Sequence, residues 1–403
     1  MALVSLFRAL HPTPESAGRV AAVPYDVIDI DEARALAAHE PLSFLHVSRA
    51  EIDLPPATDP YSPVVYETAA ARFAALKREA PLVRDEEPSL YLYGLRMDGH
   101  QQIGVAAGYS LDEYDADLIK KHERTRQDKE DDRMRHLVAL RAQTGPVFLV
   151  HRSLPAIDKA VASLTAETPL FDFTAPDAVR HTIWRVVGRA ADTLVTAFSR
   201  VQALYIADGH HRAASAARAR RALGGVSSAA ATFLAVAFPE NQVRILPYHR
   251  VVKDLGSLSA AAFLSAVKGR VRVEEGSAVP DRKGIVSMYL AGRWYALHLA
   301  AGDWAGADVL GTLDVSLLQD QIFAPILGIA DPRTDQRIDF VGGVRGTREL
   351  EKKIDAGQAQ VAFSLLPISL AELMSVADAG QILPPKSTWF EPKLRDGLLV
   401  HLI

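Results

Sequence analysis

The fold is predicted first from residues 203–225, which read ALYIADGHHRAASAARARRALGG. The stretch opens with an apolar run, Ala203 to Ala207, that has the length of a buried strand. Asp208 and Gly209 interrupt the run, and residues 212–223 are mostly Ala and Arg, which are strong helix formers. Gly224-Gly225 provides a stop. The stretch therefore predicts a strand, a polar turn and a helix.

This polar turn has two interpretations. A helix that follows a strand aims its first backbone N–H groups at a bound anion, and here the turn adds two imidazoles and a guanidinium. Alternatively, Asp208 caps the helix and the two histidines are merely solvated. Both interpretations fit these residues.

Composition limits the class of protein. Of the 403 residues, 49% are hydrophobic and 23% are charged, so the chain is expected to be globular. A net charge of −4 argues against a general nucleic-acid or membrane binder. The absence of cysteine excludes disulfides, thiolate metal sites and cysteine nucleophiles, and it fits a cytoplasmic protein. No apolar run approaches the roughly 18 residues of a membrane span, and residues 1–8 resemble a first strand rather than a signal peptide.

The alternation of strand and helix patterns predicts an α+β or mixed α/β fold. Residues 89–97 and 101–109 form a predicted hairpin across Asp98-Gly99, a favoured two-residue turn. We expect a rigid loop at 21–28 around Pro24, a helix at 32–39 capped by Asp31, and a strand at 41–48. Residues 1–255 are predicted to form a core with the polar turn. Residues 256–403 are predicted to form an α+β subdomain whose tail, 383–393, returns to the site.

Residues 120–135 are the most charged stretch of the chain. Twelve of the sixteen residues are charged, seven of them basic and five acidic. An apolar face is almost absent before Leu137, so packing does not fix this segment. It is either a solvated helix with i,i+4 ion pairs or the wall of a polar cleft.

Several catalytic motifs are absent. His122-Glu123 is followed by Arg126 where a His-Glu-x-x-His zinc motif needs its second histidine. His210 and His211 are adjacent, so they point apart on a helix. There is no Walker A pattern, Gly-x-Gly-x-x-Gly motif or Gly-x-Ser-x-Gly elbow. Gly342–Gly346 with Arg345 suits either an anion-binding turn or a tight turn alone.

Scattered cationic and acidic turns remain, and phosphoryl transfer needs such a set. The chemistry is mostly positioning and charge neutralisation, with a carboxylate that orients or deprotonates the acceptor hydroxyl. A Mg²⁺ ion held by one or two carboxylates and by substrate phosphates is compatible with this set. The turns are Tyr25-Asp26, His122-Glu123-Arg124, Asp208 to Arg212, Arg345, and Lys386-Ser387.

Five motifs in order resemble the bacterial "domain of unknown function 1015" family, from about residue 5 to the C-terminus. They are VPYDVI (23–28), HERT (122–125), ADGHHR (207–212), DPRTDQRIDFVGG (331–343) and PPKSTWFEP (384–392). The Asp-Gly-His-His-Arg turn is also similar to the phosphate-binding turn of the ParB/sulfiredoxin-like superfamily, which includes kinases of free L-serine. The resemblance implies a ParB/sulfiredoxin-like core and a nucleotide-dependent small-molecule kinase, with L-serine as the favoured acceptor and O-phospho-L-serine as product.

The resemblance also implies roles for individual residues. Glu123 is the expected proton acceptor, Asp208 is its competitor, and His211 is a further catalytic candidate. The candidates for binding nucleotide phosphates are Gly209, His210, Arg212, His122, Arg124 and Arg345. The candidates for binding substrate are Tyr25, Asp26, Lys386 and Ser387. Glu123 or Asp208 is the candidate ligand for Mg²⁺.

The expected cofactors are ATP or ADP with Mg²⁺, and the expected partners are the nucleotide and a small amino acid. A different class of function is a nucleotide-binding switch or slow nucleotide hydrolase of ParB-like type. A switch of that type would carry a basic DNA-binding domain or helix-turn-helix, and the sequence shows neither. A third hypothesis is that the protein binds an anionic metabolite without catalysis. The oligomeric state is left open.

Overall fold

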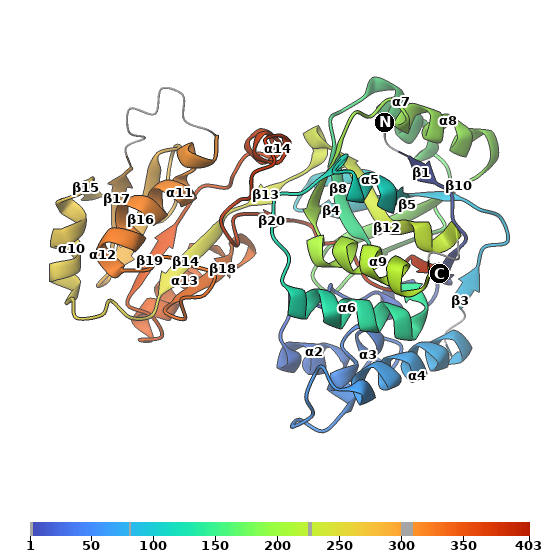
Figure 1. Ribbon diagram of the computed structural model, residues 1–403, viewed down its shortest axis with the longest axis horizontal. Coiled ribbons are helices and arrows are strands. Elements are labelled where there is room, and N and C mark those ends of the chain that lie inside the picture. Colours follow the sequence, from blue (N-terminus) through green and yellow to red (C-terminus); the bar gives the residue numbers. More distant parts are fainter. Residues whose placement is uncertain (1–2, 80–81, 225–227, 300–308) are drawn as a thin grey trace. The chain divides into compact units, whose positions relative to one another are not determined.

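The computed structural model describes residues 3–79, 82–224, 228–299 and 309–403 (Figure 1). The chain forms two compact units, with unit 1 comprising 1–243 and 392–403 and unit 2 comprising 244–391. The division falls before residue 244 rather than at 255/256, and the last twelve residues belong to unit 1. Among the described residues, no helix has the length and apolarity needed to cross a membrane.

A nine-stranded mixed sheet forms the centre of unit 1 (Figure 1). Its strands in spatial order are β6 (Ile119–Lys120), β11 (Leu204–Asp208), β8 (Val147–His151), β12 (Thr232–Pro239), β5 (His100–Ser110), β4 (Leu90–Met97), β10 (Arg180–Val186) and β9 (Phe171–Thr174), and β1 (Val4–Ser5) pairs with β5. The predicted hairpin is confirmed as β4 and β5. Asp98 and Gly99 have φ of 50° and 77°, as a type I′ turn requires.

A second sheet in unit 1 joins distant parts of the chain. It contains β3 (Leu82–Arg84), β2 (Ala9–Pro12), β21 (Val400–Leu402) and β7 (Ala142–Gln143). The C-terminal strand β21 lies between β2 and β7 and pairs with both of them. This pairing fixes residues 392–403 to unit 1.

Helices cover the sheets of unit 1, and α9 packs against α6 while α6 also packs against α4 (Figure 1). The helices are α1 (Ala17–Val20), α2 (Ile30–Ala37), α3 (Leu45–Ser48), α4 (Pro63–Glu79), α5 (Leu111–Asp115), α6 (Gln127–Leu140), α7 (Pro155–Leu164), α8 (Gly188–Phe198) and α9 (His210–Ala222). The alanines of α9 are small enough for close approach, and Ala213, Ala216 and Ala217 are buried in the core.

Two local predictions in this unit are wrong. Residues 41–48 contain turns and the short helix α3 instead of a strand, because their apolar side chains pack into a cluster of helices. The N-cap of α2 is Asp29 rather than Asp31. Asp29 accepts from the N–H of Glu32, and the Glu32 carboxylate accepts from the N–H of Asp29, so a full capping box fixes the start.

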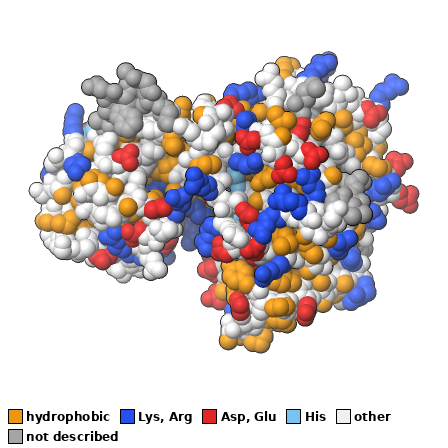
Figure 2. Space-filling model, viewed as in Figure 1, with side chains coloured by type: hydrophobic (Ala, Val, Ile, Leu, Met, Phe, Trp, Pro, Cys, Tyr) orange, Lys and Arg blue, Asp and Glu red, His pale blue; other side chains and the backbone are white. Residues whose placement is uncertain are grey.

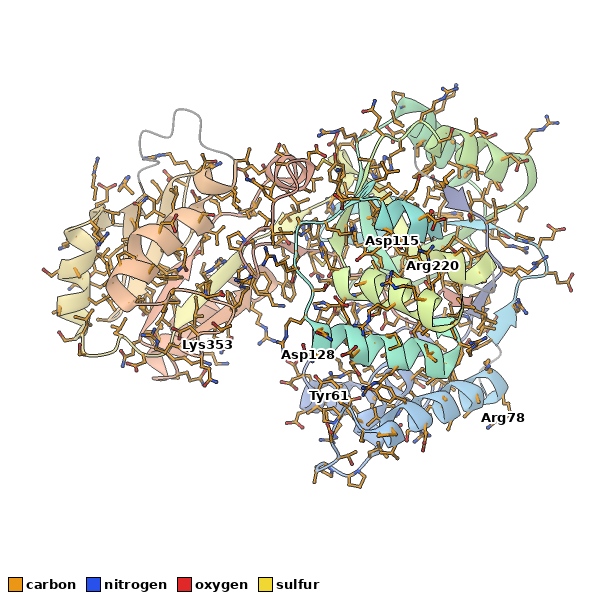
Figure 3. All side chains as sticks on the ribbon, viewed as in Figure 1. Tyr61, Arg78, Asp115, Asp128, Arg220 and Lys353 are labelled. Carbon is orange, nitrogen blue, oxygen red and sulfur yellow. The ribbon has the colours of Figure 1, made fainter. Side chains whose placement is uncertain are left out.

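The basic residues in the second half of α9 are used for packing. Arg220 pairs with Asp112 and Asp115 of α5, and Figure 3 shows Arg220 beside Asp115. Arg218 pairs with Glu130 and Asp131 of α6. On the face drawn in Figure 2, Lys and Arg side chains are interspersed with Asp and Glu. The charges of Arg218 and Arg220 are therefore neutralised by acidic residues of the neighbouring helices.

Unit 2 has a six-stranded antiparallel sheet and a two-stranded one. The larger sheet contains β15 (Arg272–Glu275), β17 (Arg293–His298), β16 (Ile285–Leu290), β19 (Val361–Ser364), β14 (Tyr248–Val252) and β18 (Ile338–Gly342), and the smaller sheet pairs β13 (Ile245–Leu246) with β20 (Trp389–Phe390). Its helices are α10 (Ala260–Lys268), α11 (Asp314–Leu318), α12 (Ala324–Leu327), α13 (Gly346–Asp355) and α14 (Leu370–Asp378). A π-helical stretch, Gln319–Phe323, joins α11 to α12. The whole chain is thus an α+β protein, as predicted.

Candidate phosphate-binding site

The turn between β11 and α9 has the layout predicted from the sequence. The register of β11 against β8 shifts between Ile206 and Asp208, which is a bulge just before the turn. Gly209 follows in a left-handed conformation with φ 90° and is the N-cap of α9. A Cβ there would lie 3.4 Å from Val147 Cα, which is an ordinary contact, so glycine is favoured by the backbone angle.

Asp208 does not cap the helix. Its Oδ1 accepts from the N–H of Gly209 at 2.8 Å, and no side chain at the N-cap accepts from the first turn of α9. The interpretation in which Asp208 caps α9 is therefore wrong. Because no cap side chain engages them, the N–H groups of that first turn can donate hydrogen bonds to a bound anion.

Lys393 holds the other oxygen of Asp208. Its Nζ donates to Asp208 Oδ2 at 2.8 Å, so the polypeptide after unit 2 returns to the turn. Burial alone would raise the pKa of Asp208, but Lys393 and Arg212 outweigh burial and lower that pKa. Asp208 is thus an ionised and weakly basic carboxylate whose two oxygens are both engaged.

Arg212 is the cation in the first turn of α9. Its Nη1 donates to the carbonyl oxygen of Pro146 at 2.6 Å, and its Nη2 lies 3.4 Å from the carboxylate of Asp26. Burial would lower the pKa of Arg212, but Asp26, Asp208 and Asp396 raise it, so the guanidinium is firmly charged. The structure therefore brings the predicted loop at Tyr25 and Asp26 to the predicted turn.

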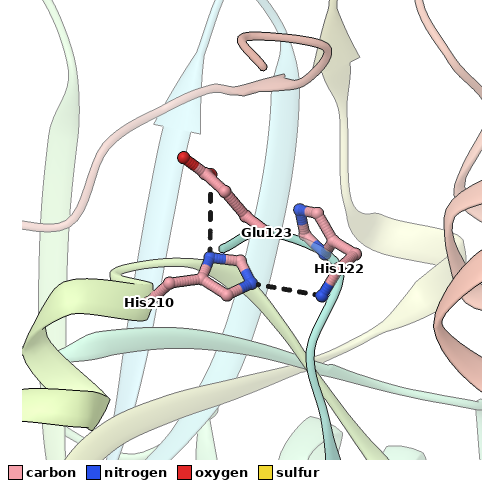
Figure 4. A group of neighbouring side chains, drawn as sticks. All are labelled: His122, Glu123 and His210. Carbon is pink, nitrogen blue, oxygen red and sulfur yellow. Dashed lines mark hydrogen bonds and ion pairs between the residues drawn. The ribbon is translucent and has the colours of Figure 1, made fainter. Parts of the chain in front are cut away.

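His122, Glu123 and His210 form a cluster beside this turn (Figure 4). The His122 and His210 rings meet edge to face, with centroids 4.5 Å apart. His210 Nε2 accepts from the backbone N–H of His122 at 3.4 Å, and its Nδ1 lies 3.9 Å from Glu123 Oε2. The loop at 121–126, between β6 and α6, thus lies against the first turn of α9, and helix α6 begins only at Gln127.

Burial determines the protonation of the two histidines in this cluster. Burial lowers the pKa of His122 to about 4, although Asp208 opposes the shift. It also lowers the pKa of His210 well below the usual value, and His122 lowers it further. Both imidazoles are therefore neutral at pH 7, so they can orient groups by hydrogen bonding but do not neutralise phosphate charge.

The neighbouring candidates lie at the edge of the cluster. His211 Nε2 accepts from the backbone N–H of Arg126 at 3.0 Å, so both histidines of the turn contact the loop at 121–126. Arg124 is exposed to solvent. Of the side chains near the turn, only Arg212 combines a secure positive charge with a position in the first turn of α9.

The cluster can also be tested as a metal site. One ligand atom from each of His122, Glu123 and His210 lies within 4.8 Å of the others. Two imidazoles and one carboxylate suit transition metals better than Mg²⁺, which prefers oxygen ligands. Asp208, the other candidate ligand for Mg²⁺, is engaged by Lys393 and Gly209. A dedicated Mg²⁺ site therefore does not fit these residues, and Mg²⁺ would have to depend on the phosphates of a ligand.

A cavity of about 50 Å³ adjoins the turn and is lined in part by Tyr25, Arg133, Arg212 and Asp396. The Arg133 guanidinium lies over the ring of Tyr25, 4.2 Å from its centroid, and donates to Ser48 O. Asp396 is only 2% exposed, and its Oδ1 has no hydrogen-bond partner among the described residues. Burial raises the pKa of Asp396 to about 7, against the opposing effect of Arg212.

Arg345, Lys386 and Ser387 belong to unit 2. Arg345 is exposed next to the start of α13, at the predicted Gly-rich turn. Lys386 has a left-handed backbone with φ 54°, and its Nζ lies 5.8 Å from the centroid of the Tyr248 ring. Ser387 is buried, and its Oγ donates to Pro384 O at 2.6 Å. Within unit 2, Ser387 therefore acts as a turn residue.

Three residues at the site were not selected from the sequence. Arg133 lies in the charged run, where nothing distinguishes it from its neighbours. Lys393 is the last residue of the Pro-fixed tail at 383–393, which is predicted to return to the site. Asp396 lies three residues after that tail. The predicted return of this tail is the signal that could have found Lys393 and Asp396. The candidates taken from it are Lys386 and Ser387, and neither of them is the residue that contacts the turn.

Comparison with known families identifies the chain. It belongs to the family described as "Protein of unknown function (DUF1015)", whose profile matches residues 4–316. No curated protein matches the sequence.

Solved structures to which the chain shows a distant similarity include one described as a free serine kinase in complex with AMP. It is 14% identical, with a TM-score of 0.36, and the match covers 73% of this chain and 92% of that one. A conserved hypothetical protein from Pyrococcus furiosus is 15% identical, with a TM-score of 0.38 and coverage of 74% and 95%. SbnI from Staphylococcus aureus, with a C-terminal truncation, is 13% identical, with a TM-score of 0.40 and coverage of 74% and 87%.

Proposed function

We propose that unit 1 binds the phosphates of ATP or ADP at the β11–α9 turn and transfers one phosphoryl group to the hydroxyl of a free amino acid. L-serine is the favoured acceptor and O-phospho-L-serine the product. The observation that carries this proposal is the turn itself. Gly209 opens the first turn of α9, Arg212 supplies a buried and firmly charged guanidinium, and the carboxylate of Glu123 lies beside His210.

In this proposal the phosphate oxygens accept from the first-turn N–H groups of α9 and from Arg212. Helix N-termini and guanidinium groups both stabilise phosphate charge, and the charge increases on the transferred group during reaction. The imidazoles of His122 and His210 are neutral, so their role is to orient Glu123 and the 121–126 loop. Mg²⁺, when bound, would accompany the nucleotide phosphates and neutralise their charge.

Glu123 is the proposed proton acceptor, in preference to Asp208. Its side chain is 41% exposed, and its Oε2 lies 3.9 Å from Nδ1 of His210 in the first turn of α9. Asp208 has a lowered pKa and both oxygens engaged, so it is a poorer base. The acceptor hydroxyl oxygen attacks the terminal phosphorus, its proton passes to Glu123, and the bond from phosphorus to the leaving nucleotide breaks.

The amino-acid acceptor is proposed to bind in the cavity beside Arg212. Tyr25 lines this cavity, Asp26 lies 3.4 Å from Arg212, and Asp396 offers a buried carboxyl group for an ammonium ion. Arg133, which lines the cavity, is proposed to donate to the substrate carboxylate. The small volume of the cavity, about 50 Å³, favours a compact amino acid.

The direct experiment is a screen for phosphorylated amino acids. The purified full chain is incubated with Mg²⁺, each of the twenty amino acids, and either ATP or ADP, and the products are read by mass spectrometry. We expect one hydroxyl amino acid, L-serine, to give a product with one of the two nucleotides. Nucleotide binding without any phosphorylated amino acid would instead favour a nucleotide-binding switch or slow hydrolase.

A further inference from the structure

Unit 2 contains its own cavity, of about 360 Å³, which the phosphotransfer proposal does not use. Tyr248 and Arg250 of β14 contribute to one part of its wall, and Leu365 to Ser369 contribute to another. The remaining lining includes Asp314 at the start of α11, together with Lys283 and Glu372. The cavity therefore combines apolar surface with a few charged groups, as small-molecule sites commonly do.

Arg250 is a buried cation without a counter-charge. Its residue surface is 2% exposed, and among the described residues no carboxylate lies within 4.0 Å of its guanidinium. Burial lowers the pKa of Arg250 to about 10, and only Tyr248 opposes this shift. A buried charge is costly unless it is paired, so an arginine kept in this state indicates an anionic partner.

The guanidinium of Arg250 is only partly satisfied. Nη1 donates to Tyr248 O at 3.0 Å, and Nη2 donates to Pro385 O and Lys386 O at 3.3 and 3.5 Å. A guanidinium has five N–H donors, so Nε–H and the second hydrogen of Nη1 have no acceptor among the described residues. The carbonyl contacts hold the side chain in place and leave its Nε edge for a ligand.

The acidic part of the lining carries the opposite charge. Asp314 accepts from Gly284 N–H through Oδ1 at 2.8 Å, and among the described residues it has no ion-pair partner within 4.0 Å. Lys283 instead pairs with Glu372. Asp314, Lys283 and Glu372 thus carry a net charge of about −1 when ionised, and Arg250 carries +1.

We propose that this cavity is a binding site for a small zwitterion, whose carboxylate is held by Arg250 and whose ammonium group faces Asp314. A carboxylate can accept one charge-assisted hydrogen bond from the Nε–H of Arg250, and its charge neutralises the guanidinium. A free phosphate carries more negative charge than Arg250 can neutralise, and it would be repelled by Asp314 and Glu372. The proposal does not rest on nucleotide binding or on turnover, because all of its contacts lie in unit 2.

Isothermal titration of the full chain without nucleotide tests this site. The probes are 4-aminobutyrate, butyrate and inorganic phosphate, together with glycine and L-alanine as shorter zwitterions. We expect at least one zwitterion to bind, and 4-aminobutyrate to bind at least tenfold more tightly than butyrate, which lacks the ammonium group. Absence of binding by every zwitterion would overturn the proposal. Equal affinity for butyrate, or binding of phosphate alone, would also overturn it.

Variants separate a ligand role from a purely structural one. Arg250→Gln keeps an amide donor for the carbonyl groups but removes the charge, and we expect it to abolish binding. Arg250→Lys keeps the charge but loses the Nε–H donor, and we expect at least a tenfold loss of affinity. Asp314→Asn should reduce the preference for 4-aminobutyrate over butyrate, a change that a structural role would not produce.

The matched control is Lys253→Gln, which removes one positive charge just after β14 at an exposed position whose side chain is 49% accessible. We expect it to bind the zwitterion with unchanged affinity. Thermal unfolding of every variant checks that the fold is retained. If Arg250→Gln lowers the unfolding temperature and the unmodified chain binds none of the probes, Arg250 only supports the turn at 384–387 and the proposal fails.

Discussion

Lys393 and Asp208 lie 185 residues apart in sequence, and the Lys393 Nζ donates to Asp208 Oδ2 at 2.8 Å. The contact joins the last segment of the chain to the start of the turn between β11 and α9. Asp208 also accepts from Gly209 N–H, so Lys393 helps to fix the conformation that opens α9. The C-terminal segment is therefore a structural part of the candidate site.

Replacing Lys393 with methionine should destabilise unit 1 by about 1–3 kcal/mol at pH 7, because Asp208 loses its charged partner. The folded-state pKa of Asp208 is lowered, so its stabilising contribution is present above the unfolded value near 4 and is lost as the pH falls further. The difference in the free energy of unfolding between the unmodified chain and the variant should therefore shrink below about pH 4. Urea unfolding at pH 7, 5 and 3.5 measures this difference, and a larger difference at low pH would contradict this account.

Gly209→Ala should cost about 1–2 kcal/mol, because alanine is strained at φ 90°. It should also weaken nucleotide binding, since the first turn of α9 must shift. Gly188→Ala is the matched control, with φ 57° at the start of α8 and nothing within 4 Å of the added Cβ. Both variants should lose stability in chemical unfolding, while titration with ATP and ADP should show a loss of affinity for Gly209→Ala alone.

Asp396 should make stability depend on pH between about 4 and 7. The folded-state pKa of Asp396 is raised to about 7, so folding is coupled to the binding of a proton by this carboxyl group between about pH 4 and 7. The protonated carboxyl group therefore stabilises the folded chain at low pH, and this contribution is lost as the pH rises to 7. Asp396→Asn should therefore gain stability relative to the unmodified chain from pH 5 to pH 8. The gain should be on the order of 2–4 kcal/mol, at about 1.4 kcal/mol per pKa unit.

Urea unfolding at half-unit pH intervals measures the effect of Asp396→Asn. The exposed Asp192 of α8 provides the control variant Asp192→Asn, which removes an equal charge away from the cavity. Parallel stability profiles for the Asp396 variant and the unmodified chain would show that this carboxyl group does not take up a proton on folding.

Glu123→Gln and Arg212→Lys should separate chemistry from binding. The first removes the proposed proton acceptor and should lower kcat by about 100-fold or more, while nucleotide affinity changes little. The second keeps a positive charge but loses the guanidinium fork that contacts Pro146 O and Asp26, so it should weaken nucleotide binding at least tenfold. Steady-state kinetics and nucleotide titration distinguish the two effects, and full turnover by Glu123→Gln would remove Glu123 from the mechanism.

Long, regular patterns in the sequence predicted their elements correctly. The β4–β5 hairpin, strand β11 and helix α9 follow directly from apolar runs, a two-residue turn and an Ala-rich segment. The prediction of a strand at 41–48 is wrong because a short apolar run fits a strand or a buried helix equally well. Its helical form depends on packing within the cluster around Phe44 and Phe73.

The sequence by itself determined the α+β class, the strand–turn–helix at 203–225 and the residues of the polar turn. Periodicity, helix propensity and the backbone freedom of Gly209 are local properties, so they can be read from neighbouring residues. Only the tertiary structure decided that His122 packs on His210, that Asp26 meets Arg212 and that Lys393 pairs with Asp208. These pairs join segments separated by 88 to 186 residues, and burial then sets their charge. The spacing of residues along the chain does not predict such contacts, because the sheet that brings the segments together forms only when the whole unit folds.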